Sequence, residues 1–517
     1  MSADRVATVR AYHTRSKHAR DRYAAGPGTL DWETQPNAFR DWVGAEITAL
    51  PRDISVGDIT WGELAERRAP LPLNHQNIGS LLRLCVGLTA WKEYAGSRWS
   101  LRAHPSSGNL HPTETWLIAA EVAGLADGLY HYQAREHALA RRAWGSGTPQ
   151  AGVYLGFSSI HWREAWKYGE RAFRYCQLDM GHVLAAVSYA AALHGWQPRL
   201  LSLDSASTAH SLGTDRATDF AGVEGEEAEL MLALDSPTTL PVDWQHWAGK
   251  PSLLDAKPLY QWPVIETVAE ATRSTAPETQ RPLVDSTLTK PRKDAISAAQ
   301  VILKRRSAQA FDGQSLMPHA VFQRILASLL SDGSPVWKLW TQTPRVHPVL
   351  LVHRVEGLAA GVYVMPRTTL AQTELREAFR ETFSWQAADT ELPLFQLIAA
   401  RAGKTARTLS CHQDIATQCA VTFMLVAEFA APIHANPAAY RHLHWEAGML
   451  GHIITLEAEA AGWRGTGIGC FFDDAVHEVL GLQDDRFQVL YHYAVGMALD
   501  DPRISTLPAY PAISACT

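Results

Sequence analysis

The chain has 517 residues, of which 46% are hydrophobic and 19% charged, and its mean hydropathy is −0.14. This composition is typical of folded globular proteins and excludes a disordered or fibrous chain. A single hydrophobic core stops growing at roughly 250–300 residues, so length alone predicts about three domains. The formal net charge of −6 comes without a clean basic arm, which argues against nucleic acid as a partner.

The six cysteines are scattered along the chain and form no C-x-x-C pair. Because no N-terminal signal peptide is visible, this pattern predicts reduced thiols and a cytoplasmic location. The longest apolar stretch, residues 419–433, is interrupted by Thr422 and Glu428 and is too short to span a bilayer. We therefore expect no membrane partner.

In the first half, residues 104–112 (His-Pro-Ser-Ser-Gly-Asn-Leu-His-Pro) are typical of a turn before the apolar strand expected at 115–120. The glycines of residues 122–130 indicate a turn between two strands. A long, mostly apolar helix is expected over 173–196, where Gly195 suits the C-terminal cap. A helix that is apolar nearly all round favours an interface between domains or subunits.

The second half repeats these features in the same order. Residues 355–363 match residues 122–130 at six of nine positions, and residues 440–463 match residues 173–196 at a constant offset. In the long helices this alignment pairs Gly181 with Gly448. A fainter match pairs Arg15-Ser16 with Arg306-Ser307.

Between the two copies lies a stretch rich in proline, threonine and charge, which is typical of a linker. We predict two homologous α+β domains, residues 1–245 and 291–517, joined by a linker over residues 246–290. Two copies of one unit, each with an antiparallel-leaning sheet and core helices, replace the three domains suggested by length. Such a chain corresponds to a dimer folded into one polypeptide.

The copies also carry family motifs. Residues 303–312 (Leu-Lys-Arg-Arg-Ser-Ala-Gln-Ala-Phe-Asp) and 465–474 (Gly-Thr-Gly-Ile-Gly-Cys-Phe-Phe-Asp-Asp) resemble the nitroreductase family of FMN-dependent oxidoreductases. Residues 104–112 and 166–174 are similar to its SagB/ThcOx-type branch, whose members oxidise azolines to thiazoles and oxazoles in peptides. Residues 12–18 and 30–36 look like the long tandem members of that branch. The resemblance implies two nitroreductase-like domains that form a pseudo-dimer within one chain.

The resemblance further implies where FMN binds. Family members are typically homodimers, in which one subunit gives the Arg-x-Ser and Gly-rich loops and the other gives the Pro-Ser-Ser-x-Asn loop. Here the intact loops lie in different halves, so we expect one FMN site between them. A damaged counterpart is expected at residues 341–348 and 197–201. The implied cofactor-binding residues are Pro105, Ser106, Ser107, Gly108, Asn109, Arg305, Arg306, Ser307, Gln309, Gly467, Ile468, Gly469 and Arg503.

Within this set, the family pattern makes Arg305 the partner of the FMN phosphate, since arginine binds phosphate bidentately. Small residues in the two loops would let backbone N–H groups approach the flavin ring. Gln309 stands where the family commonly has Lys or Arg, so the charge that stabilises reduced flavin is absent from that position. Lys167 is the candidate for a compensating cation.

Lys167 and Tyr168 are the predicted catalytic residues. They resemble the Lys-Tyr pair of azoline oxidases, which is linked to proton removal as hydride leaves to flavin N5. A lysine that acts as a base needs a lowered pKa, which burial provides. The alternative is a surface lysine beside a packed tyrosine. The second half has His434 at the equivalent position, which agrees with a single active site.

Two other patterns are interpreted as structural. The histidines and cysteines between Cys411 and His444 fit no compact set of metal ligands, so no metal is predicted. Asp179 and Glu446 each lie five residues after an arginine of the same long helix, Arg174 and Arg441. We predict that each pair forms a structural ion pair.

The leading hypothesis is therefore an FMN-dependent oxidoreductase that transfers hydride between an organic substrate, for example a peptide azoline, and flavin N5. One alternative is an NAD(P)H-dependent nitro or quinone reductase, because the family reuses the flavin face for nicotinamide. Another is a non-catalytic flavin-binding protein, which Gln309 and the damaged counterpart favour slightly. The expected partners are a small-molecule or peptide substrate and NAD(P)H or O2, and further homo-oligomerisation stays open.

Overall fold

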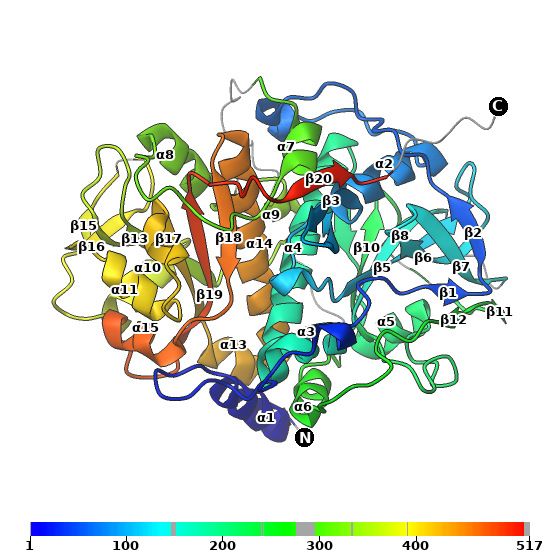
Figure 1. Cartoon of the computed structure of the whole chain (residues 1–517), viewed down its shortest axis with the longest axis horizontal. Helices are drawn as coiled ribbons and strands as arrows, with labels where there is room; N and C mark the ends of the chain where they lie inside the picture. Colours follow the sequence, from blue (N-terminus) through cyan, green and yellow to red (C-terminus); the bar gives the residue numbers. More distant parts are fainter. Residues whose placement is uncertain are drawn as a thin grey trace.

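The computed structural model describes residues 2–145, 151–238, 240, 242–275, 295–331, 334–389 and 391–510. Two sheets lie on opposite sides of a central pair of long helices, α4 (Ala172–Leu193) and α14 (Ala439–Ala460), which pack side by side (Figure 1). Nearly every residue of α4 is buried, and most of α14 is buried as well. These are the two helices that the repeat placed at an interface, and they join the two halves of the chain.

The sheet of the first half has eight strands in the order β11-β7-β6-β5-β8-β10-β9, with β2 also paired to β7, and its neighbours are antiparallel. Its central strands β5 and β8 are buried at every residue, because helices and loops cover both faces. The bounds are β2 (Glu46–Ala49), β5 (Thr113–Ala120), β6 (Gly128–Gln133), β7 (Ala138–Trp144), β8 (Gly152–Ser159), β9 (Pro198–Leu200), β10 (Glu227–Leu234) and β11 (His246–Trp247).

The sheet of the second half has seven strands in the order β15-β16-β14-β13-β17-β19-β18, all antiparallel. The bounds are β13 (Val346–Val352), β14 (Gly361–Val364), β15 (Gln386–Ala387), β16 (Phe395–Ala399), β17 (Val421–Glu428), β18 (Arg464–Ile468) and β19 (Phe487–Gly496). The order β14-β13-β17-β19-β18 repeats the order β6-β5-β8-β10-β9 strand for strand. The prediction of two homologous α+β domains is therefore confirmed.

The described helices differ in number between the halves, although α4 and α14 follow the repeat. In the first half they are α1 (Ser2–Arg15), α2 (His75–Cys85), α3 (His161–Tyr168), α4, α5 (Ser205–Leu212) and α6 (Pro263–Ala271). In the second half they are α7 (Ala298–Lys304), α8 (His319–Ser328), α9 (Val336–Leu339), α10 (Thr369–Ala378), α11 (Gly403–Leu409), α12 (Ile415–Gln418), α13 (Ala430–Ala435), α14 and α15 (Asp473–Leu480). Side chains at Asn74, Asp204 and Thr368 cap α2, α5 and α10 by accepting backbone N–H groups.

Both ends of the chain cross to the other half. After β19, the C-terminal strand β20 (Ser505–Pro508) pairs with β3 (Leu88–Tyr94), which also pairs with β4 (Ser97–Arg102), and Tyr510 then donates a hydrogen bond to Ala134 O at 3.0 Å. At the other end, His18 forms a backbone bridge with Phe472. These crossings tie the halves together in addition to the contact between α4 and α14.

Part of the stretch predicted as a linker is folded. β11 pairs with β7, β12 (Lys250–Pro251) pairs with β1 (Trp42–Val43), and α6 packs against α1 and α4. Residues 246–275 therefore belong structurally with the first half, whereas residues 276–290 of the predicted linker lie outside the described residues. The exact domain boundaries stay a prediction.

The match between Arg15 and Arg306 is wrong. Arg15 binds Glu170 through Nε at 2.7 Å, near the N-terminal end of α4. In the first half, Arg68 precedes α2 as Arg306 precedes α8 in the second. The Arg68 guanidinium donates to Ala192 O at the C-terminal end of α4. A dipeptide match was too short to set the alignment.

No described helix combines the length and the apolar character that a bilayer span requires.

Candidate functional site

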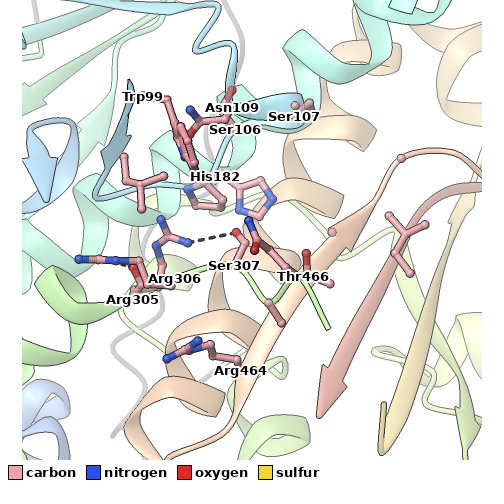
Figure 2. Close-up of a pocket in the computed structure, with 18 of the residues that line it drawn as sticks. Trp99, Ser106, Ser107, Asn109, His182, Arg305, Arg306, Ser307, Arg464 and Thr466 are labelled. Carbon is pink, nitrogen blue, oxygen red and sulfur yellow. Dashed lines mark hydrogen bonds between the residues drawn. The ribbon is translucent and has the colours of Figure 1, made fainter. Parts of the chain in front are cut away.

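A cavity of about 990 Å³ lies between the two halves of the chain. Figure 2 shows its two sides, with Ser106, Ser107 and Asn109 facing Arg305, Ser307 and Arg464. Its volume falls within the range of about 300–1,000 Å³ that is usual for small-molecule and cofactor sites. Of the predicted site residues, the cavity is lined by Pro105, Ser106, Ser107, Gly108, Asn109, Tyr168, Arg305, Arg306, Ser307, Gln309, Gly467, Ile468 and Gly469.

Asp179 of α4 holds the loop of residues 105–109 in place through hydrogen bonds. The Asp179 carboxylate accepts hydrogen bonds from Ser106 Oγ at 2.7 Å, from Ser107 N at 3.0 Å and from Ser107 Oγ at 2.9 Å. Burial raises the pKa of Asp179 to about 7, although these hydrogen bonds oppose the shift. The buried carboxyl, which also lines the cavity, therefore fixes the shape of the loop.

The same loop has an unusual backbone. Gly108 and Asn109 have φ values of 57° and 60°, and His111 follows with a φ of 53°. Asn109 Nδ2 donates to Ser100 O at 2.9 Å, and Asn109 Oδ1 contacts His111 Nε2 at 3.1 Å. Positive φ values at non-glycine residues are uncommon and persist where the surroundings hold them, often at ligand sites.

Lys167 and Tyr168, at the end of α3, lie against this loop. A Cβ built on Gly108 would be 2.5 Å from the Tyr168 hydroxyl and 3.2 Å from Lys167 Nζ. Tyr168 lines the cavity, whereas Lys167 is half-buried behind the loop and lies over the Trp32 ring at 5.7 Å. Burial lowers the pKa of Lys167, and Glu164 opposes that shift. Its counterpart His434 is exposed on α13.

Arg305 connects the two halves. Its Nε donates to Ala103 O at 2.9 Å and its Nη2 to Arg102 O at 3.1 Å, both in the first half, and its Nη1 donates to Ser307 Oγ at 3.3 Å. The side chain is buried, and burial lowers its pKa to about 10. Much of its donor capacity is thus used within the protein, between the segment before Pro105 and the segment at Ser307.

Four other cations line the same cavity: Lys92, Lys304, Arg306 and Arg464. Burial lowers the pKa of Lys92, and the nearby Arg306 lowers it further. Arg464 Nη1 donates a hydrogen bond to Asp500 Oδ1 at 2.5 Å, and Asp500 and Asp501 also line the cavity. The sequence interpretation missed Lys92, Lys304 and Arg464: Lys92 is far away in the chain, Lys304 directly precedes the predicted Arg305, and Arg464 directly precedes the motif of residues 465–474. We call these four residues the cation cluster.

The glycines of residues 467–469 serve packing within the protein. A Cβ on Gly467 would lie closer than 3.0 Å to the Tyr491 hydroxyl, and one on Gly469 closer than 3.0 Å to the Tyr175 ring. Tyr491 also contacts His182 Nε2 at 3.2 Å. Tyr175 and His182 belong to α4, so these glycines let β18 and its following loop approach the central helix closely.

Among the predicted cofactor-binding residues, the structure separates Arg503 from the others. Arg503 does not line the cavity; its Nη2 donates to Asp501 at 2.7 Å, and its side chain is 68% exposed. Its guanidinium lies over the Tyr94 ring at 5.2 Å. By contrast, Gln309 is exposed toward the cavity, next to the segment of Arg305 to Ser307.

The predicted ion pairs within the long helices are wrong. Arg174 binds Asp473 at 2.7 Å, and Arg441 binds Glu229 at 2.6 Å. Helix residues three or four apart share a face, whereas residues five apart do not, so these carboxylates point elsewhere. The sequence signal that could have marked Asp179 as important is that the repeat places a carboxylate, Glu446, at the matching position.

Glu446 is the counterpart of Asp179 in the second half of the chain. It accepts the backbone N–H groups of Arg345 and Val346 at 3.1 and 3.2 Å, as Asp179 does for its loop, and it also binds the buried Arg367. At part of the counterpart position, between β9, β10 and the start of α14, lies a hollow of only about 30 Å³. Within the described residues, space for a large ligand is thus present in one copy of the site.

Comparison with known proteins agrees with this architecture. Residues 302–497 match the sequence profile of the Nitroreductase family. The second half of the chain is a nitroreductase family domain. The crystal structure of a putative nitroreductase from Anabaena variabilis superposes with a TM-score of 0.70 at 23% identity, over 95% of this chain and 99% of that one. The whole chain therefore has the fold of that protein, with two nitroreductase-like halves.

A curated relative is the trifolitoxin-processing protein TfxB from Rhizobium leguminosarum bv. trifolii. It is 32% identical over 149 residues, which cover 25% of this chain. The match spans 40% of the length of TfxB. The nitroreductase family domain thus occurs here in a chain that shares part of its sequence with a protein named for trifolitoxin processing.

Proposed function

We propose that this protein is an FMN-dependent oxidoreductase that binds one FMN between its halves. The observation that carries the proposal is the cavity of about 990 Å³, where the loop of residues 105–109 faces the segment of residues 305–309, while its counterpart has only about 30 Å³. A family that typically builds its flavin site from two subunits would need the two halves to meet in this way. The duplicated fold supplies both partners in one chain.

The chemistry of the lining residues fits FMN. The cation cluster gives one end of the cavity the positive charge that a phosphate requires. The hydroxyls and amides of Ser106, Ser107, Asn109 and Gln309 offer hydrogen bonds to the polar edge of a flavin ring. Bound FMN would supply a two-electron acceptor and donor.

The predicted phosphate contacts need revision. Arg305 is retained, because its Nη1 reaches the cavity side at Ser307 Oγ, but its other donors hold the backbone of the first half. We assign most of the phosphate binding to the cation cluster instead. Arg503 is not retained, since its guanidinium binds Asp501 outside the cavity lining.

Lys167 is the proposed base. Its lowered pKa gives it a larger neutral fraction near pH 7 than an exposed lysine has, so it can take a proton from a substrate carbon. Tyr168 forms part of the cavity wall, and both side chains lie against Gly108, which also lines the cavity. We propose that these two residues position and deprotonate the substrate. The neutral Gln309 leaves Lys167 as the candidate cation near the flavin ring.

A peptide azoline is the substrate class that we favour. TfxB is named for the processing of trifolitoxin, and the shared segment supports a peptide as the first candidate substrate for this chain. The alternative, reduction of a nitro compound or quinone with NAD(P)H, uses the same cavity. A cytoplasmic location also remains a proposal.

The first test is the FMN content of the purified full-length chain, measured by absorbance after heat release. We expect one FMN per chain after reconstitution. Two FMN per chain would show that the small counterpart hollow opens and would overturn the single-site proposal. A chain that takes up no FMN would overturn the cofactor assignment itself.

The second test separates the two reactions with the variant Lys167→Met. If Lys167 is the base, the variant keeps FMN but loses oxidation of an azoline peptide, while anaerobic bleaching of the flavin by NADPH is unchanged. Rapid bleaching by NADPH together with no azoline oxidation by the wild-type chain would favour the reductase. The matched control is Lys257→Met, an exposed lysine far from the cavity lining.

A further inference from the structure

Two cysteines meet in the wall of the cavity. Cys470 directly follows the glycines of residues 467–469, and Cys411 follows α11 with a φ of 50°. Both are half-buried and both line the cavity. Gln413 Nε2 donates both to Ser410 O at 3.0 Å, next to Cys411, and to Cys470 O at 3.1 Å, which ties the two segments together. The pKa of each thiol is shifted by a hydrogen bond with the other, so the two thiols, from distant parts of the sequence, lie side by side.

His18 adds a donor to this pair. The His18 Nδ1 accepts the backbone N–H of Ala24 at 2.9 Å, so the ring proton of the neutral imidazole sits on Nε2. That leaves Nε2–H to donate the hydrogen bond that His18 forms with Cys470. A donor fixed in this way favours the thiolate over the thiol.

The surroundings of Cys470 are held rigidly. Arg171 donates to Gly469 O at 3.3 Å and to Asp473 Oδ2 at 3.0 Å, and Gln413 Nε2 donates to Cys470 O at 3.1 Å. The backbone N–H of His18 donates to Asp473 Oδ2 at 3.0 Å. The segments that carry the sulfur atoms and the imidazole are therefore fixed to one another.

Hydrogen bonding and charge shift the pKa values of the two thiols in opposite directions. The hydrogen bond from Cys411 lowers the pKa of Cys470 to about 5, with His18 and Arg171 contributing and burial opposing. The hydrogen bond to Cys470 and then burial raise the pKa of Cys411. The other titratable groups that face the pair are Asp473 of α15, Tyr23 of the N-terminal segment, and Tyr168 and Tyr175 at α3 and α4.

We propose that Cys470 and Cys411 form a redox-active dithiol, in which Cys470 is the attacking thiolate and Cys411 the resolving thiol. A thiolate in an accessible wall, with a donor on one side and a second thiol in contact, is the arrangement of cysteines that undergo reversible oxidation. The two cysteines lie in the wall of the proposed flavin cavity, but the proposed hydride chemistry does not use them.

The chemistry balances with a low-molecular-weight disulfide as oxidant. The Cys470 thiolate attacks one sulfur of that disulfide, which forms a mixed disulfide and releases one thiolate. The Cys411 thiol then loses its proton and attacks the Cys470 sulfur, which releases the second thiol and forms the Cys411–Cys470 bond. The two cysteines lose two electrons, and the oxidant is reduced to two thiols.

Three other cysteines serve as internal controls. Cys85, Cys176 and Cys419 are fully buried, and burial raises the pKa of each of them. Thiols of this kind are inert toward disulfides in the folded state. Cys516 lies outside the described residues, so the experiment is done in the Cys516→Ser background.

The test treats the full-length chain with oxidised glutathione, blocks free thiols at low pH and maps the peptides by mass spectrometry. We expect a disulfide between Cys411 and Cys470 in the parent chain, and one glutathione trapped on Cys470 in Cys411→Ser. Cys470→Ser is expected to leave Cys411 unmodified. Trapping on Cys411 instead, or equal modification of the three buried cysteines, would overturn the proposal.

A second measurement needs no cysteine variant. At pH 6 we expect iodoacetamide to alkylate Cys470 about ten times faster than Cys411 in the same chain, because only the thiolate reacts. His18→Gln keeps a side-chain hydrogen-bond donor, so we expect it to slow the alkylation of Cys470 less than His18→Leu does. Equal alkylation rates of the two cysteines at pH 6 would contradict the proposed division of roles.

Discussion

Gly181 of α4 and Gly448 of α14 face each other where the two central helices cross. A Cβ on Gly181 would lie closer than 3.0 Å to Trp445 O and to the Cα of Gly448. A Cβ on Gly448 would meet Leu178 O and the Cα of Gly181 in the same way. The repeat pairs these two glycines in sequence, and the structure places them in contact near the pseudo-symmetry axis of the chain.

We therefore predict that Gly181→Ala and Gly448→Ala each destabilise the protein. In an ordinary helix interior this change stabilises by about 1 kcal/mol. Here the new methyl group meets backbone atoms that cannot rotate away, and overpacking of this kind costs about 1–3 kcal/mol. The measurement is the apparent unfolding temperature, which should fall in both variants.

The matched control is Gly225→Ala, since a Cβ on Gly225 would meet no atom within 4 Å. Its unfolding temperature should stay close to that of the parent chain. An increase in Gly181→Ala would mean that the helices separate easily, and the account of a fixed interface would fail.

Why did the sequence predict this interface but not the loop contacts around it? The long helices carry an apolar pattern and matched glycines at a constant offset, which are local signals within one segment. Asp179 bonds Ser106 and Ser107, which lie some seventy residues earlier in the chain, and no local pattern encodes that contact. Lys92 of the cation cluster was missed for the same reason, because strand pairing of β20 with β3 brings it to the cavity.

Asp179 leads to a prediction about pH. Its pKa is raised from 3.8 to about 7 in the folded chain, so between these values the folded state keeps a proton that the unfolded state releases. The contribution of Asp179 to stability is therefore complete below about pH 4, falls as the pH rises and is lost above about pH 7. The slope is at most about 1.4 kcal/mol per pH unit.

Asp179→Asn removes this titration. Relative to the variant, the parent chain should become less stable between pH 4 and pH 7 and then change no further, as measured by unfolding temperatures across that range. Glu377→Gln, at an exposed position of α10, is the control and should give a constant difference from the parent. A constant difference for Asp179→Asn as well would exclude the raised pKa.

Gly108 gives a prediction about catalysis. Alanine at this position has to adopt a φ of 57° and displace the Tyr168 hydroxyl, which lies 2.5 Å from the built Cβ. We expect Gly108→Ala to lower the turnover number at least tenfold while most FMN binding is retained, because the change moves Tyr168 and Lys167 rather than the cation cluster. Steady-state kinetics and FMN titration measure the two effects separately.

The effect of backbone strain on turnover has to be separated from the effect of displacing the Tyr168 hydroxyl. Gly96, in the turn between β3 and β4, has a φ of 83° but open space around its Cβ position. Gly96→Ala therefore carries a comparable backbone strain of about 1 kcal/mol without touching the site. Equal losses of turnover in Gly96→Ala and Gly108→Ala would show that the Tyr168 contact is irrelevant.

The last prediction concerns the cation cluster and compares FMN with riboflavin, which lacks the phosphate. Arg306→Ala should weaken FMN binding by roughly 10- to 100-fold, because a charge-assisted hydrogen bond to an anion contributes about 1.5–3 kcal/mol. Riboflavin binding should stay unchanged in this variant. Gln309→Ala, three residues on in the same segment, should instead weaken both ligands by a similar factor, since its amide is placed to contact the ring. If Arg306→Ala weakened riboflavin as strongly as FMN, the cluster would not be the phosphate site and the orientation of the flavin in the cavity would be reversed.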